Sequence, residues 1–599
     1  MSKPQLRSSQ VVTTFGPGAM VDLPDASVIV AGLDNWHYDV NQIPLIQEPR
    51  LVEKLKRILG VPTLTLRPPP PASDRNFKFQ PSITVWRFPE WFIVQETQIT
   101  KQGFRRRRLV HLNSLDGGKY RDADGKKYSV VPVRFVRACK KGHVGDIDWK
   151  PFVHGTPTPC SRDLWMEERG TTGDLDQIWV VCDCGAQRPM AQAARMELRA
   201  LGSCNGLRPW LGPGTKESCG EPNRLLIRSA SNAYFPQLMS VISIPDLQSA
   251  VDEIVKSAWD AGLSIVDSPE KLAMMRQIPN LAVKLQGLDD ATVLASVTRV
   301  RQGSGGADRP VKEVEFEALS AAQDELGSDT PDGDFFARAL PKSQWNAPWM
   351  SAIERIVLVH RLREVVAQVG FTRFEAAGPD IQGDLSLDVK RAPLALDSSW
   401  LPAVENRGEG IFLQIRAEVV AAWLQRPAVQ QRGVQLAEGF QRWKAEHEGS
   451  SREFPGLPYY MLHSLSHLLL TAISLECGYP ASSLRERIFA APDCYGILIY
   501  TGSSDAEGTL GGLVVAARDI RRHMRRALES GALCSNDPVC ANHAPTRHDH
   551  QHLHGSACHG CLLTAETSCE QRNEFLDRAL VVPTVEALGA EFFASHAYL

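Results

Sequence analysis

Cysteines are crowded near the carboxyl end of this chain, and their spacing restricts the local fold more than any other sequence feature. A Cys-His-Gly-Cys run begins at Cys558; Cys569 follows it, and Cys534 and Cys540 precede it. A two-residue gap lets both thiolates turn back onto one ion, and Zn–S bonds of about 2.3 Å leave the loop little freedom. The pattern therefore predicts a zinc site, in preference to unrelated buried cysteines at chance spacing.

Five cysteines compete for the four places of a tetrahedral ion in this stretch. We expect the ion to be held by Cys540, Cys558, Cys561 and Cys569, with Cys534 as the alternative fourth ligand. Histidines also crowd the segment, and we interpret most of them as solvated loop residues, because alternating histidines in a polar run seldom converge on one ion. They are His543, His548, His550, His552, His554 and His559.

Length and composition bound the class of protein. The chain has 599 residues, of which 43% are hydrophobic and 23% charged, so we expect a soluble protein of three or four domains. No apolar run approaches the roughly 18 residues of a membrane helix, and no apolar segment typical of a secretory signal is evident. We therefore expect a cytoplasmic protein without a membrane partner. In that compartment we expect its thirteen cysteines to be reduced and the clustered ones to be metal ligands in preference to disulfides.

The order of motifs predicts a multidomain α+β protein. We expect an N-terminal mixed α/β domain over residues 1–130 and a zinc-ribbon-like cysteine module over 131–231. A mainly helical middle region would follow over 232–408, with an acidic linker near 302–333. The last part, 409–599, would be a C-terminal α/β zinc-binding domain.

Hydrophobic periodicity predicts individual elements within this organisation. Apolar residues at helical spacing indicate an amphipathic helix over 352–369 and further helices over 417–424, 459–475 and 512–530. A short continuous apolar run over 496–500 is typical of a buried strand.

The central region carries enough ligand-type side chains for two more tetrahedral sites. One grouping places Cys182, Cys184, Cys204 and Cys219 around one zinc ion. The other would be formed by Cys139, His143, Cys160 and His154, with His154 the least certain member. A single site, with the remaining residues merely structural, is the alternative. Such closed sites stabilise small modules by roughly 10 kcal/mol or more, and nothing in their spacing indicates catalysis.

Several catalytic signatures are missing from the sequence. No Gly-x-x-x-x-Gly-Lys-Ser/Thr loop occurs, so the chain has no such cradle for nucleotide phosphates and should not be an ATP-driven motor by itself. His463 and His467 are four residues apart on one predicted helix, as in zinc peptidases, but the residues between them include no glutamate. We interpret them as histidines that are hydrogen-bonded inside a helical core.

Two basic features could contact phosphate groups or a protein partner. The first is the run Arg105, Arg106, Arg107 and Arg108. The second is one face of the helix predicted after Gly512, formed by Arg518, Arg521, Arg522, Arg525 and Arg526. Either could neutralise DNA phosphates, and either could equally be a solvated surface or the rim of a protein interface.

Three strings of the last third resemble the zinc-binding domain found at the C-terminus of MrfA-like helicases. They are residues 461–469, 505–512 and 557–578, where Cys558, Cys561, Cys569 and an Asn-x-x-Leu-Asp-Arg tail over 573–578 match the family pattern. The strings 7–10, 14–18, 22–24, 139–143 and 231–236 resemble the DrmB family of the DISARM anti-phage system.

These resemblances imply a function that the residues alone do not. They imply a non-ATPase subunit of an anti-phage defence complex that associates with a separate, DrmA-like helicase and helps to bind or load on foreign DNA. Two or three structural zinc ions would stabilise it.

Two other functions remain open at this stage. A metal-dependent nuclease would use His463, His467, Asp505 and Glu507 around an ion with an open coordination position. A purely structural adaptor would make no DNA contact.

Overall fold

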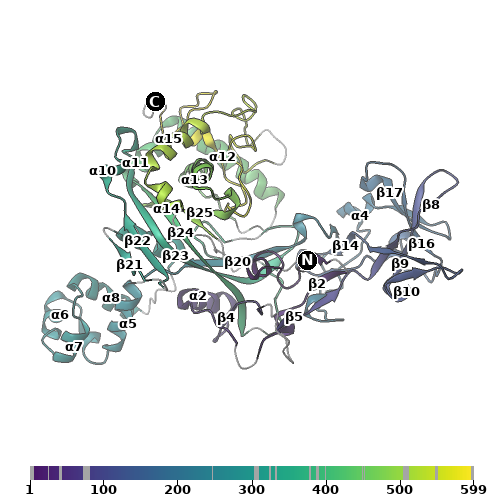
Figure 1. Cartoon of the computed structure of the whole chain (residues 1–599), viewed down its shortest axis with the longest axis horizontal. Helices are drawn as coiled ribbons and strands as arrows, with labels where there is room; N and C mark the ends of the chain where they lie inside the picture. Colours follow the sequence, from purple (N-terminus) through teal and green to yellow (C-terminus); the bar gives the residue numbers. More distant parts are fainter. Residues whose placement is uncertain are drawn as a thin grey trace.

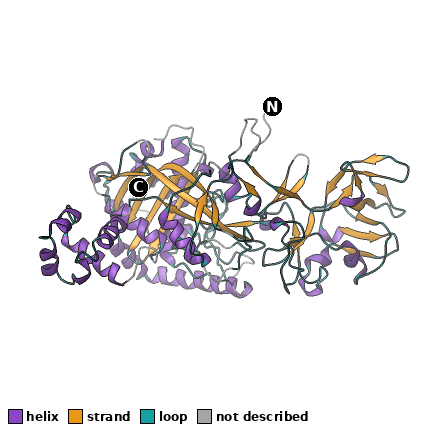
Figure 2. Ribbon diagram, turned by 90° about the horizontal axis from the view of Figure 1, so that it is seen from below, coloured by secondary structure: helices purple, strands orange, loops and turns teal. Residues whose placement is uncertain are grey.

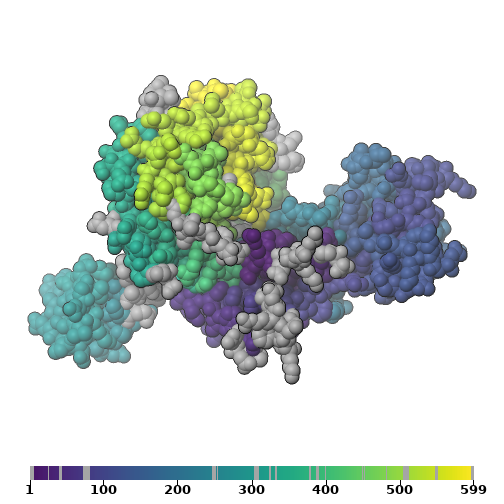
Figure 3. Space-filling view, viewed as in Figure 1, coloured from purple at the N-terminus to yellow at the C-terminus, as the bar shows by residue number. Residues whose placement is uncertain are grey.

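The structure is a computed structural model in which most of the chain is described. The described residues are 6–23, 26–39, 43–71, 81–245, 247–302, 309–322, 325–330, 333–376, 379–385, 390–397, 399–447, 450, 452–502, 512–546 and 551–594. The molecule is elongated, with a large central body and a smaller lobe at each end of its long axis (Figures 1 and 3). Within the described ranges, no helix is both long and apolar enough to cross a bilayer.

The N-terminal segment forms short strands and two helices beside the central body. Its elements are α1 Ser8–Thr13, β1 Met20–Asp22, β2 Ser27–Val30, β3 Trp36–His37, α2 Pro49–Leu59, β4 Thr65–Arg67, β5 Ser82–Ile83 and β6 Val85–Arg87. Strand β4 pairs in parallel with the strand Trp400–Ile415 of the C-terminal half. This pairing joins the N-terminal segment to the large sheet.

One end lobe is built mainly from antiparallel strands (Figures 1 and 2). Its elements are β7 Trp91–Val94, β8 Gln98–Ile99, β9 Arg105–His111, β10 Leu115–Asp116, β11 Lys119–Arg121, β12 Lys127–Tyr128, β13 Val130–Pro132, β14 Phe135–Ala138, β15 Val144–Gly145, α3 Trp149–His154, β16 Leu164–Glu168, β17 Ile178–Cys182, β18 Gln187–Pro189, α4 Ala191–Ala194 and β19 Arg224–Ile227. The main sheet runs β13-β7-β9-β16-β17-β18, and β15-β14-β19 form a second one.

The opposite end lobe is helical and has an apolar core of its own. The middle of the chain contains β20 Phe235–Ile242, α5 Leu247–Ser257, α6 Pro269–Met275, α7 Pro279–Lys284, α8 Asp290–Gln302, α9 Val311–Ala321, β21 Leu326–Gly327, β22 Phe335–Ala339, α10 Lys342–Trp345, β23 Ile353–Thr372 and β24 Trp400–Ile415. Helices α5 to α8 form the lobe, while the strands return to the central body (Figure 1).

The helix predicted over 352–369 is wrong, because these residues lie in the long strand β23. This strand pairs with β24 along one edge and with β22 and β20 along the other. All of its residues from Leu362 onward are buried. Since both faces of the strand are covered, apolar residues occupy successive positions and the two-residue alternation of a half-exposed strand is lost.

The remaining predicted elements of the C-terminal part are confirmed with small changes. They are α11 Ala417–Leu424, α13 Leu457–Cys477, β26 Cys494–Thr501, and α14 Gly512–Ala517 with α15 Ile520–Gly531; helix α12 Pro427–Glu446 and strand β25 Leu484–Ala491 were not predicted. The single helix expected over 512–530 is therefore two short helices. The large sheet runs β21-β22-β23-β24-β26-β25, and α13 packs on β25 and β26 as the centre of the largest apolar core.

Candidate metal centres

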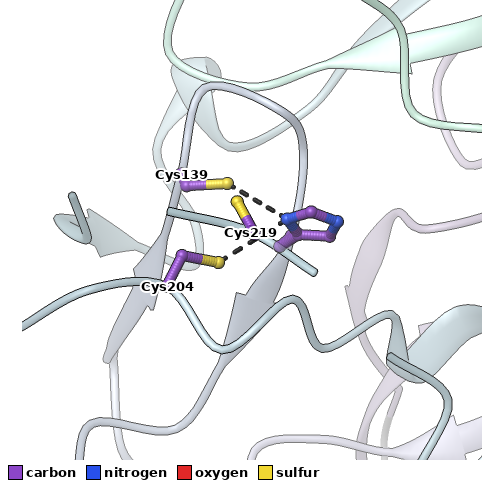
Figure 4. Close-up of side chains that lie close together, drawn as sticks. Cys139, Cys204 and Cys219 are labelled. Atoms are coloured by element: carbon purple, nitrogen blue, oxygen red, sulfur yellow. Dashed lines mark hydrogen bonds between the residues drawn. The ribbon is translucent and has the colours of Figure 1, made fainter. Parts of the chain in front are cut away.

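Four ligand-type side chains converge beside the small sheet of the strand-rich lobe. They are Cys139, His143, Cys204 and Cys219, whose ligand atoms all lie within 4.8 Å of one another. His143 Nδ1 is 3.3 Å from Cys139 Sγ and 3.5 Å from Cys204 Sγ, and the three cysteines point toward one another (Figure 4). The other ring nitrogen, Nε2, is 2.8 Å from Glu217 Oε1, as in the carboxylate–histidine–zinc arrangement that orients a metal ligand.

Strand pairing explains why residues so far apart in the sequence meet. In the antiparallel ladder of β14 and β19, Ala138 lies opposite Arg224. Cys139 therefore leaves β14 where the chain that carries Cys219 enters β19. We infer that this ladder, rather than a local loop, sets the position of the first centre.

A second centre lies at the end of the β16–β17 hairpin. His154, Cys160, Cys182 and Cys184 have ligand atoms within 4.8 Å of one another. The hairpin pairs Leu164 with Cys182, which brings Cys160 Sγ within 3.6 Å of Cys182 Sγ. His154 Nδ1 donates to the Lys150 carbonyl at 2.9 Å, and its Nε2 is 3.1 Å from Cys184 Sγ.

The eight central residues are thus brought together in two sets, but the sets differ from the predicted grouping. Cys204 and Cys219 join Cys139 and His143, whereas Cys182 and Cys184 join His154 and Cys160. The prediction kept residues that are neighbours in sequence together. In the structure, Cys204 and Cys219 change places with His154 and Cys160, because strand pairing decides which residues meet.

The third centre is the knuckle near the carboxyl end, formed by Cys534, Cys540, Cys558 and Cys561. The sulfur atoms of Cys534 and Cys558 are 3.4 Å apart, and Cys561 Sγ is 3.7 Å from both Cys540 and Cys558. Four Zn–S bonds of 2.3 Å in a tetrahedron place the sulfur atoms about 3.8 Å apart. The spacing fits zinc, and it is far longer than the roughly 2.05 Å of a disulfide.

Hydrogen bonds in this knuckle stabilise the thiolate form of one of its cysteines. Burial raises the pKa of the Cys558 thiol, but hydrogen bonds from Asn536, Cys534 and the Gly560 amide outweigh it and bring the pKa down to about 7. Thiolates are the form that binds metal. These hydrogen bonds favour the thiolate of Cys558, whereas the pKa of the Cys540 thiol is raised by its contact with Cys561 and by burial.

The preferred ligand set for this centre was wrong in one member. Cys534, the alternative, occupies the fourth place, and Cys569 lies elsewhere, with its Sγ 3.1 Å from His463 Nε2. Of the neighbouring histidines, His543 and His552 are buried and bonded to backbone carbonyls rather than solvated. His548 and His550 lie outside the described residues.

His463 and His467 are buried in α13 and hydrogen-bonded, as the sequence interpretation expected. They do not face water, and they approach Glu486 of β25, which sequence reasoning missed. The only signal for Glu486 was a carboxylate inside a strand that is otherwise apolar on its covered face. Asp505 and Glu507, the other members of the nuclease hypothesis, lie outside the described residues.

The four-arginine run forms most of strand β9, and three of its arginines form ion pairs with carboxylates. Arg106 and Arg108 lie over the ring of buried Trp165, at 4.1 and 4.7 Å from its centroid. Each of these two also has a carboxylate partner, and Arg107 Nη2 is 2.6 Å from Glu168. The guanidinium groups therefore cover an aromatic side chain and balance local charge, which leaves less of their positive charge for phosphates.

The second basic feature is the exposed face of α15. Arg521, Arg522, Arg525 and Arg526 of this helix are exposed, and so is Arg518 in the turn before it, while the helix buries Ile520, His523, Met524, Ala527 and Leu528. Arg522 pairs with Glu476 and Asp519. Among the described residues, the side chains of Arg521 and Arg525 form no ion pair. This helix thus presents positive charge to solvent from a rigid support on α13.

Together, the mixed helix and sheet content and the cysteine–histidine clusters define an α+β multidomain protein with centres of the zinc-binding type. The model of the MrfA Zn-binding domain matches residues 465–562, and the model of a domain of unknown function, DUF8724, matches residues 7–235. The DISARM protein DrmB of Bacillus paralicheniformis is 31% identical over 523 residues, which are 84% of this chain and 90% of that protein. The chain belongs to the DrmB family of DISARM proteins.

A solved structure also shows a distant likeness. It is the crystal structure of the DUF1998 helicase MrfA bound to DNA, at 12% identity and a TM-score of 0.16. The match covers 36% of this chain and 23% of that helicase. At this level the likeness carries no argument about fold or binding.

Proposed function

We propose that this chain is a non-ATPase subunit of a DISARM anti-phage complex that associates with a helicase and helps to bind or load on foreign DNA. Its membership of the DrmB family carries the proposal, together with the MrfA Zn-binding domain in its last third. Since the sequence contains no phosphate-binding loop of the Walker type, ATP hydrolysis would come from the partner.

In this proposal, three zinc ions have a structural role. Each of the three centres described above offers four protein ligands, which leaves no place for a catalytic water. The first two hold together the loops of the strand-rich lobe, and the knuckle holds the segment after α15. Because such segments bury little apolar surface of their own, metal binding would supply much of their folding free energy.

DNA or partner contact is assigned to the arginine face of α15. Arg521 and Arg525 are exposed and have no carboxylate partner among the described residues, and they are placed to neutralise phosphates or acidic side chains. The β9 arginines are a weaker candidate, because Arg106 and Arg108 stack on Trp165 and pair with carboxylates.

Charge reversal tests the assignment of α15. The variant Arg521→Glu/Arg525→Glu should weaken at least one of two interactions. These are DNA binding by the complex and co-purification with the helicase partner. A matched control, Lys271→Glu/Lys284→Glu in the helical lobe, changes net charge equally and should leave both unaffected. If the α15 variant behaves like the control, the helix makes neither contact. Loss of partner binding without any DNA crosslink to the chain would favour the structural adaptor.

The burial of both histidines argues against the metal-dependent nuclease. A catalytic ion needs an open coordination position, whereas His463 and His467 have fully buried side chains. A nuclease assay with Mg²⁺ or Mn²⁺ compares the purified chain with His467→Ala. We expect no metal-dependent cutting by either; cutting that disappears in the variant would support the nuclease instead.

A further inference from the structure

A fourth group of ligand-type side chains lies inside the central body, away from the three centres above. His463 and His467 come from α13, Glu486 from β25 and Cys569 from the segment after the knuckle. The side chains of both histidines and of Glu486 are fully buried. Glu486 Oε1 is 2.9 Å from His463 Nε2 and 3.3 Å from His467 Nε2, and Cys569 Sγ is 3.1 Å from His463 Nε2.

A hydrogen bond at Nδ1 fixes the orientation of each histidine ring. His463 Nδ1 bonds to the Phe575 carbonyl at 3.3 Å, and His467 Nδ1 bonds to the Leu562 carbonyl at 2.9 Å. A carbonyl oxygen only accepts, so both Nδ1 atoms carry the hydrogen and, in a neutral ring, both Nε2 lone pairs face the group. His154 in the second centre has the same arrangement with the Lys150 carbonyl, which is usual for zinc-bound histidine.

Cys569 shares a further feature with the cysteines of the other centres. Its sulfur accepts hydrogen bonds from the backbone amides of Gln571 at 3.4 Å and Asn573 at 3.0 Å. An amide two residues further along the chain likewise donates to the sulfur of Cys204, Cys534 and Cys558. Such amides stabilise a negatively charged sulfur. The backbone around Cys569 is thus shaped like that around the ligands of the three centres.

A bound divalent cation would balance the charges of this group and accept the lone pairs of its nitrogen atoms. With neutral rings, two nitrogen lone pairs face a carboxylate oxygen at hydrogen-bond distance with no hydrogen between them. Glu486 Oε2 is also buried and has no hydrogen-bond partner among the described residues. Two extra protons would relieve the contact but leave surplus positive charge in an apolar core. A divalent ion with one thiolate and one carboxylate is neutral.

We propose that His463, His467, Glu486 and Cys569 bind a fourth Zn²⁺ ion. Two imidazoles, one carboxylate and one thiolate are all accepted ligands of zinc. With four buried protein ligands, the ion is structural rather than catalytic. The ion would cross-link helix α13, strand β25 and the segment after the knuckle. Metal coordination would then add to apolar packing in holding the C-terminal part on the large sheet.

Diffraction from crystals of the full chain, recorded above and below the zinc absorption edge, tests the proposal without any variant. An anomalous peak among the four side chains is expected, and the three centres described above serve as internal references. Peaks at those centres without one at this group would overturn the proposal while leaving the proposed function intact.

Zinc counting by native mass spectrometry is the second test. Cys569→Ser should lose one zinc ion per chain and keep the others, whereas Cys494→Ser is the matched control. Cys494 is half-buried and lies outside the metal-type groups formed by the described residues. A folded Cys569→Ser chain with the zinc content of the wild type would also overturn the proposal.

Discussion

Arg432 Nε donates a hydrogen bond to Asp577 Oδ2 at 2.7 Å, and both side chains are buried. Asp577 also accepts from the backbone amides of Ser556 and Ala579. The pair connects α12 to the tail that follows the metal-binding segments. The Asn-x-x-Leu-Asp-Arg string that carries the family resemblance thus has a physical role as an internal anchor.

Removing the carboxylate of this anchor should destabilise the C-terminal part strongly. Asp577→Ala leaves the Arg432 guanidinium buried without a partner charge, which typically costs about 3–5 kcal/mol. Thermal unfolding followed by calorimetry should show a clearly lower Tm. The control, Asp116→Ala, removes an exposed carboxylate that pairs with Arg121 and should change the Tm far less. Equal shifts for the two variants would contradict the anchoring role of Asp577.

The composition of the two central centres can be tested with paired substitutions. Cys139 and Cys204 belong to one centre, and Cys182 belongs to the other. The double variant Cys139→Ser/Cys204→Ser should therefore lose one zinc ion per chain, whereas Cys139→Ser/Cys182→Ser should lose two. If the grouping predicted from the sequence were right, Cys139→Ser/Cys204→Ser would lose two zinc ions, because it places these residues in different centres. Metal content measured by mass spectrometry on folded protein decides between them.

The type of residue in these centres could be predicted from the sequence, but their partners could not. Clustered cysteines and histidines indicate zinc because few other roles need so many thiols at the spacing of metal ligands. Which of them meet depends on strand pairing: β14 with β19 brings Cys139 to Cys219, and β16 with β17 brings Cys160 to Cys182. Register is a property of the assembled sheet and cannot be read from ligand spacing.

Because tertiary pairing cannot be deduced from local sequence, β23 was predicted as a helix and Glu486 was not predicted as a site residue. In residues 353–372 the apolar positions fit a helix as well as a strand buried on both faces, and only the many β-branched residues favoured the strand. Glu486 reaches the histidines because α13 packs on β25. Helix α13 itself was predictable, since its long apolar run begins after Gly456 and ends before Gly478, which has positive φ.

A buried carboxylate in the large sheet predicts a pH-dependent stability. Burial alone raises the pKa of Glu364, but the charge of Arg485 and hydrogen bonds from Asn406 and Tyr500 outweigh it and leave the pKa below its usual value. A lowered folded-state pKa contributes stability above the unfolded pKa of about 4.3, and that contribution is lost as the pH falls through the folded value. Glu364→Gln should therefore be less stable than wild type at neutral pH.

The difference in Tm between Glu364→Gln and wild type should shrink as the pH is lowered below about 5. An exposed glutamate provides the control: Glu418, 71% exposed and at the start of α11, should give a glutamine variant whose small difference from wild type hardly varies with pH. A gap that stays constant or widens toward acid would show that the Glu364 charge is not stabilised in the folded state.

The salt dependence of DNA binding should report directly on α15. Each phosphate contact contributes about 0.9 to the slope of log K against log salt concentration for duplex DNA. If Arg521 and Arg525 each neutralise one phosphate, Arg521→Ala/Arg525→Ala in the complex should lower the magnitude of that slope by about 2. Arg106→Ala should change it little, because this guanidinium lies over Trp165 and near Asp183. An unchanged slope with weaker helicase association would place the arginines at the protein interface, since ion pairs between proteins release far fewer condensed counterions than contacts with duplex phosphates.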